Sequence, residues 1–417
     1  MSSGSESSAS TPPAAPTEQI TRKKGGRTGL YVAVAVIVVI IIVLAAAYGL
    51  GWLKTSSSSK TSSSCAAPAV VPASVPTVTS AIQPAGGQTL NGAGSTLVAP
   101  LMFQWATAYT NNTVNYASVG SGAGISDITA KTVDFGASDA PLNPAQRAAI
   151  PSPGVVTIPE SAGAAVPVYN LPSVSATLKF TGAILAGIYL GQLTNWNNTA
   201  LQAVNPGITL PNACIVVVHR SDGSGTTFVW SSFLSAANST WKSQVGFGTT
   251  VNWPVGLGSK GNSGVTATVK STEDAIGYVD INYALTNSVA FGAVQNPSGN
   301  YIVANITNIA SAIKDANPTL PPGTGDWYNV SVLNAPGAHD YPIATLTYLF
   351  VYKDVGVAYG SSYSLTKAEA LVDFLHWILT TGQTYSGALY YVPLASGIVS
   401  ADMTTIASLT YNGAPIP

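Results

Sequence analysis

Residues 30–53 form an apolar segment that contains no charged residue, LYVAVAVIVVIIIVLAAAYGLGWL. At 1.5 Å per helical residue, a segment of this length can cross a hydrocarbon core of about 30 Å. Four basic residues precede it within residues 22–27, whereas only Lys54 and Lys60 follow it closely. The excess of positive charge before the segment predicts a cytoplasmic N-terminus and a C-terminal part outside the cell.

We therefore predict a cytoplasmic tail at residues 1–29, a transmembrane anchor at residues 30–53, and a single-pass protein of the cell membrane whose C-terminal domain is extracellular. A cleaved signal peptide is the main alternative. The apolar run is longer than the ~7–15 residues of a signal-peptide core, and no clean A-x-A cleavage site follows it. A prepilin-like signal cleaved near Gly25 or Gly26 is a third alternative.

Residues 54–87 are rich in Ser, Thr, Pro and Ala and show neither a helical nor a strand period. This composition predicts a linker. The linker contains Cys65, and Cys214 is the only other cysteine, so the chain has neither a disulfide framework nor a cysteine spacing typical of metal sites. A Cys65–Cys214 disulfide and a buried free thiol at Cys214 both stay open.

Charged residues are scarce in this chain. Only 8% of residues are Asp, Glu, Lys or Arg, against about 25% in an ordinary soluble domain, and 16 basic and 17 acidic residues leave a net charge of −1. Such a chain has no basic surface on which to hold nucleic acid. Its 46% of hydrophobic residues also exclude a disordered chain.

From about residue 88 onward, short apolar runs alternate with helical patterns. Apolar residues at helical spacing predict a helix over residues 98–109 and another around residues 371–378, the latter preceded by a Thr366-x-x-Glu369 capping box. Strands alternating with helices predict an α/β fold. The predicted strands are VDFGAS, VVTI, AAVPVYNL, IVVV, AIGYV and ATLTYLFVYK.

Three loops rich in Gly, Ser and Thr lie beside predicted strands and at the starts of predicted helices. Hydroxyls and free backbone N–H groups at the N-terminus of a helix form an anion site. One such loop alone is more often an ordinary turn or helix cap, but three together with an arginine favour a binding site. The loops are residues 92–97 (GAGSTL), 120–124 (GSGAG) and 220–227 (RSDGSGTT).

Three charged residues accompany these loops. Arg220 follows an apolar strand and precedes a helix, which suggests bidentate binding of a tetrahedral oxyanion, and Asp222 could hold its guanidinium in place. Asp139 would repel a bound anion unless the anion still carries a proton to donate, as phosphate does and fully ionised sulfate does not. The alternative for Asp139 is a simple turn or cap residue before Pro141.

The sequence from about Leu90 to about Val392 resembles the substrate-binding protein of the Pst-type phosphate ABC transporter. Five motifs carry the resemblance, and they occur in the order found in that family. They are LNGAGSTLVAPL, VGSGAGISDITAKTVDFGASDAPL, GIYLGQLTNWNNTALQAVNPGITLP, VVHRSDGSGTTFVW and the stretch from GSKGNSGVTATVK to AIGYVD.

The resemblance implies an α/β, two-lobed periplasmic-binding-protein-like fold (type II) with a hinge, lobe 1 comprising residues 88–169 plus 341–417 and lobe 2 residues 170–340. It further implies that Asp139 accepts the proton of phosphate and that Asp222 supports Arg220. The full set of phosphate-binding residues that it implies is Thr96, Leu97 through its N–H, Ser121, Asp139, Arg220, Ser224, Gly225 and Thr226.

The sequence departs from the family pattern at three places. Leu97 stands where the family usually has Phe, and because that contact is made by the main chain we expect little loss. His219 stands before Arg220 at a position where the family frequently has Arg, which leaves open whether the site carries a second positive charge. The N-terminal anchor and linker also depart from a soluble periplasmic form.

We therefore expect a protein that captures inorganic phosphate outside the cell and delivers it to an ABC-type permease with its ATPase, without cofactor, metal or nucleic acid. The chain has no P-loop motif, so we expect no ATP hydrolysis by it. One alternative is an adhesion or S-layer-associated surface protein. Another is a phosphate- or acyl-ester hydrolase with Ser224 as nucleophile, although no G-x-S-x-G motif surrounds that serine.

Overall fold

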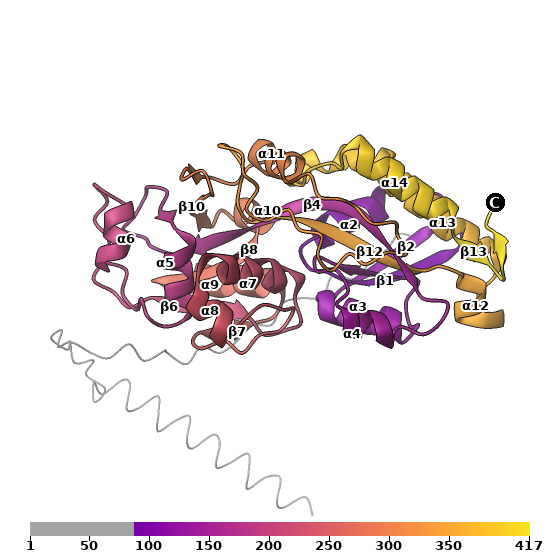
Figure 1. Ribbon diagram of the computed structural model, residues 1–417, viewed down its shortest axis with the longest axis horizontal. Coiled ribbons are helices and arrows are strands. Elements are labelled where there is room, and N and C mark those ends of the chain that lie inside the picture. Colours follow the sequence, from indigo (N-terminus) through magenta and orange to yellow (C-terminus); the bar gives the residue numbers. More distant parts are fainter. Residues whose placement is uncertain (1–86) are drawn as a thin grey trace, which may run out of the picture. The chain divides into compact units, whose positions relative to one another are not determined.

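The computed structural model describes residues 87–417 (Figure 1). The predicted cytoplasmic tail, the predicted anchor at residues 30–53 and nearly all of the predicted linker lie outside the described residues. None of the helices between residues 87 and 417 is long and apolar enough to span a membrane.

The described residues form a mixed α/β structure built around one nine-stranded sheet. Its strands are β1 (Thr89–Gly94), β2 (Thr113–Ser118), β3 (Phe135–Ser138), β4 (Val155–Tyr169), β6 (Val216–Arg220), β7 (Leu257–Ser259), β8 (Ala275–Asp280), β9 (Ala290–Phe291) and β12 (Ala344–Tyr352). Two smaller sheets contain β5 (Lys179–Phe180), β10 (Ala293–Gln295) and β11 (Tyr301–Ile302), and β13 (Thr410–Tyr411) and β14 (Ala414–Pro415).

Helices pack around these sheets. They are α2 (Ala99–Ala108), α3 (Ser121–Thr129), α4 (Pro144–Ala149), α5 (Gly182–Tyr189), α6 (Thr199–Val204), α7 (Gly225–Ala237), α8 (Ser239–Gln244), α9 (Gly261–Ser271), α10 (Ile281–Thr286), α11 (Ile306–Ala316), α12 (Val355–Tyr359), α13 (Leu365–Leu379) and α14 (Ser396–Ala407). Three short 3₁₀ helices are η1 (Gly360–Ser362), η2 (Thr381–Tyr385) and η3 (Gly387–Leu389).

The order of the main sheet is β2-β1-β3-β12-β4-β8-β6-β7, and its long strand β4 divides it into two halves. Residues 155–164 of β4 pair antiparallel with β12, whereas residues 165–169 pair antiparallel with β8. On one side β1 is parallel to β2 and β3, and on the other β6 is parallel to β7 and β8. We call the β2-β1-β3-β12 side the first half and the β8-β6-β7 side the second half.

The strands at the centre of the sheet are buried along nearly their whole length. All nine residues of β12 and all six of β8 are buried, because helices cover both faces of the sheet. This explains why their sequences are continuous apolar runs rather than alternating ones. The predicted VVTI and AAVPVYNL strands belong to one continuous strand, β4, which ends at Tyr169, and a register shift opposite Thr347 and Tyr348 leaves one of its residues, Glu160, without a partner in the pairing.

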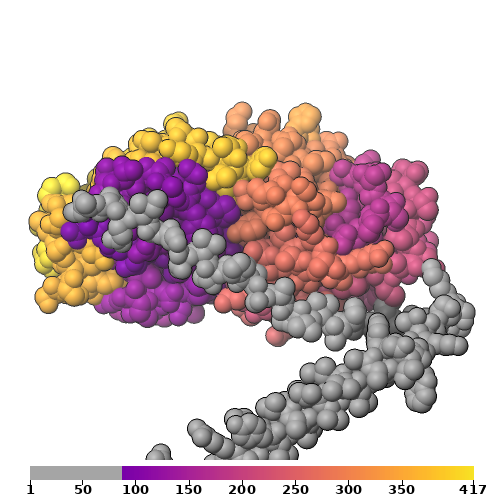
Figure 2. Space-filling view, turned by 180° about the vertical axis from the view of Figure 1, so that it is seen from behind, coloured from indigo at the N-terminus to yellow at the C-terminus, as the bar shows by residue number. Residues whose placement is uncertain are grey.

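The first half joins segments from both ends of the described sequence. Figure 2 shows the N-terminal (indigo) and C-terminal (yellow) segments side by side, and α13 contacts β1. The helix predicted over residues 98–109 is α2, whose Trp105 is fully buried and donates through Nε1 to the carbonyl of Gly382 at 2.7 Å. Residues about 280 positions apart in sequence therefore build one core.

Two local predictions need correction. The capping box predicted at Thr366 is wrong, because α13 starts earlier: the Ser364 side chain caps it by accepting from the N–H of Lys367 at 3.1 Å. The free-thiol alternative for Cys214 is also wrong, since Cys214 is disulfide-bonded. The other cysteine of the sequence, Cys65, lies outside the described residues.

Replacing Gly124 with alanine should destabilise the fold. A Cβ on this residue of α3 would lie 2.5 Å from the Cα of Gly94 and 2.6 Å from the carbonyl oxygen of Ala93, and backbone atoms cannot move aside cheaply. We expect Gly124→Ala to lower the free energy of unfolding in urea by about 2 kcal/mol. Gly397→Ala in α14, where the new Cβ would meet nothing within 4 Å, is the control and should raise it by about 0.5 kcal/mol. Equal effects of the two substitutions would contradict this packing.

Candidate anion-binding site

The N-termini of three helices lie around one buried carboxyl group, that of Asp139 directly after β3. Ser95, in the loop before α2, donates its hydroxyl to Oδ1 of Asp139. Ser121, the first residue of α3, accepts from the N–H of Asp139 at 3.3 Å. Gly225, the first residue of α7, lies so close that an added Cβ would be 2.6 Å from Oδ2 of Asp139. The three predicted loops therefore meet at Asp139.

The loop before α2 is fixed by tyrosine hydroxyls from β2, α10 and the segment that follows η3. Tyr116, Tyr283 and Tyr391 donate to the carbonyl oxygens of residues 95, 96 and 97 at 2.8, 2.7 and 2.6 Å. Of the hydroxyls in this loop, that of Ser95 donates to Asp139, whereas that of Thr96 accepts from Asn262. The N–H of Leu97 donates to the hydroxyl of Ser95 at 3.0 Å.

Arg220 ends β6 and lies almost fully buried. Its Nε and one terminal nitrogen donate to the two oxygens of Asp222 at 2.7 and 2.5 Å, so Asp222 holds the guanidinium as the sequence suggested, while the bidentate contact is made with Asp222 and not with an anion. The side chains of Arg220 and Asp222 are 1% and 12% exposed. Burial would raise the pKa of Asp222, but the hydrogen bonds and positive charge of Arg220 outweigh it and hold that pKa below its usual value.

The start of α7 brings further polar groups to Arg220. Ser224 caps this helix by accepting from the N–H of Thr227 at 3.0 Å, so its hydroxyl faces its own helix. The hydroxyl of Thr226 accepts from Arg220 at 3.5 Å. The first N–H groups of an α-helix have no partner within it, so those of α7 are available to an anion held between Arg220 and Asp139.

Asn262, at the start of α9, links the two halves and was missed by the sequence analysis. Its amide nitrogen donates to the hydroxyls of Thr96 at 2.9 Å and Thr226 at 3.2 Å. Its side-chain oxygen accepts from the N–H of Asp280 at 3.0 Å. Its position within the GSKGNSG motif was the signal that could have identified it.

A second contact between the halves is made by glycines alone. The N–H of Gly122 in α3 donates to the carbonyl of Gly223 at 2.9 Å. A Cβ at Gly120, whose φ is +99°, would lie 2.4 Å from Oδ2 of Asp222. Only residues without a Cβ allow the α3 loop and the Arg220 loop to approach this closely, which is the physical reason for the glycines in both motifs.

Two more buried carboxyl groups lie near Asp139. Glu160 in β4 and Asp280 at the end of β8 are both fully buried. The hydroxyl of Thr347 in β12 lies 3.2 Å from Oδ1 of Asp139 and 3.1 Å from Oε1 of Glu160. The sequence analysis missed Glu160, although a glutamate inside an apolar strand of so charge-poor a chain was a signal for it.

Burial raises the pKa of all three carboxyl groups. The pKa of Asp139 rises to about 6, against the opposing effects of the Ser95 hydrogen bond and the charge of Arg220. The pKa of Glu160 rises to about 8 because of burial and the nearby charge of Asp139, and that of Asp280 rises well above its usual value for the same two reasons. With a pKa of about 6, Asp139 is mostly ionised at pH 7 and can accept the proton of a ligand.

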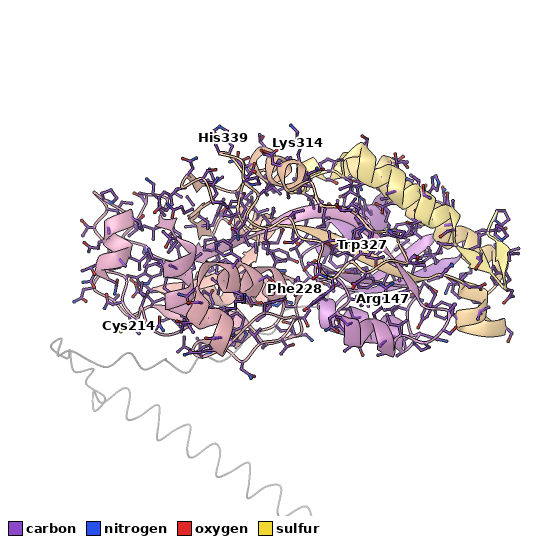
Figure 3. The ribbon with its side chains drawn as sticks, in the orientation of Figure 1. Arg147, Cys214, Phe228, Lys314, Trp327 and His339 are labelled. Carbon is purple, nitrogen blue, oxygen red and sulfur yellow. The ribbon has the colours of Figure 1, made fainter. Side chains whose placement is uncertain are left out.

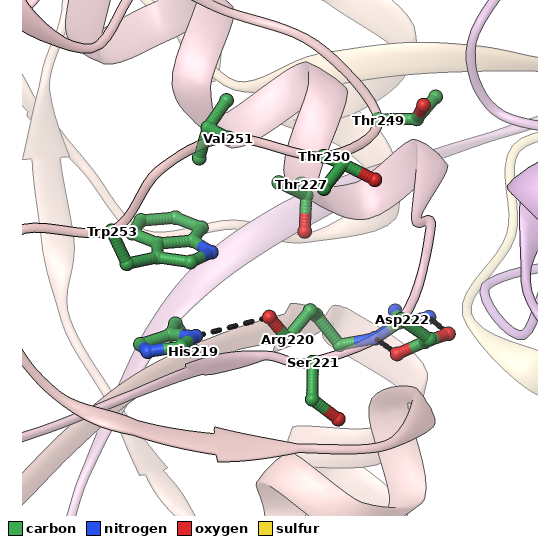
Figure 4. Close-up of a pocket in the computed structure, with 9 residues that line it drawn as sticks. All are labelled: His219, Arg220, Ser221, Asp222, Thr227, Thr249, Thr250, Val251 and Trp253. Atoms are coloured by element: carbon green, nitrogen blue, oxygen red, sulfur yellow. Dashed lines mark hydrogen bonds and ion pairs between the residues drawn. The ribbon is translucent and has the colours of Figure 1, made fainter.

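A cavity of about 170 Å³ is lined in part by Arg220 and Asp222 (Figure 4). His219 and Trp253 stack in its wall with their rings 4.8 Å apart, and the other lining residues are Arg220, Ser221, Asp222, Thr227, Thr249, Thr250 and Val251. Burial lowers the pKa of His219, which disfavours a positive charge on its ring.

The arrangement lacks the parts of a hydrolase. The hydroxyl of Ser224 caps α7, Nδ1 of His219 faces the carbonyl of Arg220 at 3.0 Å, and His339 and His376 are exposed, His339 near α11 (Figure 3). Among residues 87–417 no cluster of His, Cys, Asp or Glu could hold a metal ion. A buried arginine, hydroxyls, helix N-termini and one proton-accepting carboxylate instead suit the binding of a protonated oxyanion.

Fold and site together define a binding protein for a small anion, and comparisons with known proteins agree. Residues 79–381 match the family model described as a PBP superfamily domain. A phosphate-binding protein PstS of Xylella fastidiosa is 38% identical over 319 residues, covering 74% of this chain and 82% of the relative. The PstS protein of Haemophilus influenzae is 38% identical over 320 residues, covering 76% and 92%.

Solved structures share the fold. A human phosphate-binding apolipoprotein superposes with a TM-score of 0.62 at 20% identity, covering 79% of this chain and 100% of that one. A high-affinity periplasmic phosphate-binding protein bound with phosphate superposes with a TM-score of 0.60 at 18% identity, covering 79% and 99%. The chain belongs to the PBP superfamily and, within it, to the family of PstS phosphate-binding proteins. This is a family of substrate-binding proteins and not of enzymes, so the hydrolase and adhesion alternatives lose their support.

Removing the partner of Arg220 should cost more stability than breaking the other ion pair of the described residues, Lys367–Asp134. We expect Asp222→Asn to lower the free energy of unfolding by about 3 kcal/mol, because it leaves a buried guanidinium without a counter-charge. Lys367→Gln should cost less than about 1 kcal/mol, because the side chain of Lys367 is 22% exposed. Urea unfolding at pH 7 measures both, and similar losses would show that Arg220 does not depend on Asp222.

Proposed function

We propose that this chain binds inorganic phosphate between the two halves of its sheet and delivers it to an ABC-type permease with its ATPase. The observation that carries the proposal is the position of a buried Arg220, held by Asp222, across from a buried Asp139 that can accept a proton. The family of the chain supports the same ligand.

In the proposed complex, Arg220 and the hydroxyls of Thr96, Ser121 and Thr226 donate to the phosphate oxygens, as do the N–H groups of Gly225 and Thr226 at the start of α7. The N–H groups of Leu97 and Ser224 donate instead to the hydroxyl of Ser95 at 3.0 Å and to the carbonyl of Thr249 at 2.8 Å. Asp139 accepts the proton that phosphate still carries. Sulfate is fully ionised at neutral pH and would face the carboxylate without a proton between them, so it would be repelled. In this complex, neutral hydrogen-bond donors replace the water molecules that hydrate the free ion and stabilise its charge.

We propose that the halves act as two lobes that close over the ion, with β4 and the segment entering β12 as the two hinge crossovers. Lobe boundaries at residues 88–169 plus 341–417 and 170–340 stay a prediction. The exchange of β4 from β12 to β8 at residues 164 and 165 supports a hinge near this place.

We also propose that the protein acts outside the cytoplasmic membrane, anchored by residues 30–53 through a linker at residues 54–87. The charge asymmetry around the apolar segment supports this orientation. An anchored binding protein would keep captured phosphate close to the permease.

Replacing Arg220 with alanine should remove most of the phosphate affinity. We expect Arg220→Ala to raise the Kd for phosphate by about 100-fold or more, because it removes a buried charged donor and leaves Asp222 unpaired. Arg147→Ala is the matched control, since Arg147 donates only to the carbonyls of Thr324 and Gly325. Calorimetric titration of the full-length chain measures both. Unchanged affinity in Arg220→Ala, or no binding of phosphate by the natural chain, would contradict the proposal.

Replacing Asp139 with asparagine should weaken the discrimination between phosphate and sulfate. An amide can donate to an unprotonated oxyanion, so we expect the ratio of the sulfate Kd to the phosphate Kd to fall by at least about tenfold. Asp315→Asn, at an exposed position, is the control. Competition of sulfate with phosphate in the same titration measures the ratio. A ratio that stays unchanged in Asp139→Asn would mean that this carboxylate does not recognise the proton.

A further inference from the structure

Glu160 occupies an irregular position in the central strand β4. In the pairing of β4 with β12, Thr347 lies opposite Ser161 and Tyr348 lies opposite Pro159, so Glu160 is the extra residue of a β-bulge. A bulge changes the direction of a side chain relative to the regular alternation of a strand. Here it brings the carboxyl group of Glu160 onto the hydroxyl of Thr347, which also contacts Asp139.

Thr347 cannot donate to both carboxyl groups at once. A threonine hydroxyl has one hydrogen, and its oxygen lies 3.1 Å from Glu160 and 3.2 Å from Asp139. If both carboxyl groups were ionised, one buried oxygen would face the hydroxyl oxygen without a hydrogen between them. A proton on Glu160 resolves this, because Oε1 of Glu160 then donates to Thr347 and Thr347 donates to Asp139.

The surroundings of Glu160 favour this proton. Its side chain is fully buried, and within the described part of the chain its Oε2 atom has no hydrogen-bond partner. Neither of the two ion pairs found among residues 87–417 includes Glu160. Burial together with the charge of Asp139 raises the pKa of Glu160 to about 8. An ionised, unpaired carboxylate would be costly in such a place.

We propose that Glu160 is a positioning residue for phosphate binding: its protonated carboxyl group turns the hydroxyl of Thr347 onto Asp139 and so keeps Asp139 an ionised acceptor for the proton of the ligand. The inference rests on the proposed function for its effect on affinity, but the proton on Glu160 does not depend on it. Glu160 thus acts on the ligand through two hydrogen bonds and does not touch it.

Glu160 can donate to Thr347, and Thr347 to Asp139, only while Glu160 is protonated, so this arrangement determines the pH range in which the site binds phosphate. The titratable and charged groups that interact with Glu160 or Asp139 are Asp280 at the end of β8, Arg220 of β6, and Tyr116, Tyr283, Tyr348 and Tyr391. Burial raises the pKa of each tyrosine further, so the tyrosines stay neutral. Above about pH 8, ionised Glu160 would draw the hydroxyl of Thr347 away from Asp139 and add a negative charge near the anion. Phosphate affinity is therefore greatest between about pH 6, below which Asp139 is itself protonated, and about pH 8, and it falls above pH 8.

The test compares the natural full-length chain with Glu160→Gln. Glutamine keeps the shape and the donor of a protonated glutamate but cannot ionise. Calorimetry with phosphate should show the Kd of the natural chain rising at least about fivefold between pH 7 and 9.5, whereas the Kd of Glu160→Gln changes less than about twofold. Because the ligand titrates identically in both experiments, the difference reports on Glu160. Parallel pH profiles, or a Glu160→Gln chain that binds more than tenfold more weakly at pH 7, would overturn the proposal.

Two variants of Thr347 test the connection. Thr347→Val removes the hydroxyl and should weaken phosphate binding at pH 7 about as much as the natural chain loses by pH 9.5. Thr347→Ser keeps the hydroxyl and should bind like the natural chain. If Thr347→Val binds phosphate at pH 7 as tightly as the natural chain, Glu160 does not act through this hydroxyl.

A measurement without ligand separates this proposal from the proposed function. The sequence has five glutamates, Glu6, Glu18, Glu160, Glu273 and Glu369, so ¹³C labelling of glutamate gives few carboxyl resonances. The resonance absent from Glu160→Gln should titrate near pH 8 in the ligand-free chain. A midpoint below about pH 6 would overturn the proton order whether or not phosphate binds. Failure of the natural chain to bind phosphate, with a midpoint near pH 8, would overturn only the proposed function.

Discussion

The structure depends on keeping one positive charge buried at the place where its two halves meet. Arg220 is almost excluded from solvent, and Asp222 compensates its charge by accepting from Nε and one terminal nitrogen in a bidentate pair. The pair in turn fixes the loop between β6 and α7 and, through an N–H of Gly261 that donates to Asp222 at 3.0 Å, the start of α9. A charge placed this way attracts an anion in a medium of low polarity, where the attraction is stronger than in water.

Around this pair the chain uses neutral groups wherever it can. Hydroxyls, amides, backbone N–H groups and the ends of helices supply the other donors, in agreement with a composition that has few charged residues. The exceptions are three carboxyl groups that burial makes reluctant to ionise, Asp139, Glu160 and Asp280. Burial raises the pKa of each of these carboxyl groups, and hydrogen-bond donors lower it by amounts that differ from one group to the next. Which of the three carries a proton therefore affects which ligand can bind.

Strand β4 connects the fold to this chemistry. It pairs with β12 in the first half and with β8 in the second, so one continuous backbone joins both sides of the site. Its bulge at Glu160 interrupts the pairing near the carboxylate that would receive the proton of the ligand. A local irregularity that would weaken an ordinary strand thus directs a side chain toward the binding site.

Much of this could be predicted from the sequence, because local patterns depend on short-range physics. Continuous apolar runs indicated buried strands, Gly-Ser loops before helices indicated anion sites, and the spacing of Arg220 and Asp222 indicated their pairing. The capping of α13 by Ser364 instead of Thr366 and the fusion of two predicted strands into β4 were not predicted, since neighbouring residues offered equally good local solutions. Asn262, Thr347 and Glu160 belong to the site only because long-range packing brings three distant segments together. The sequence by itself therefore determined which chemical groups the protein has available and which local elements carry them. Only the tertiary structure decided which groups are buried together, and burial, which depends on distant neighbours, is what sets their charge.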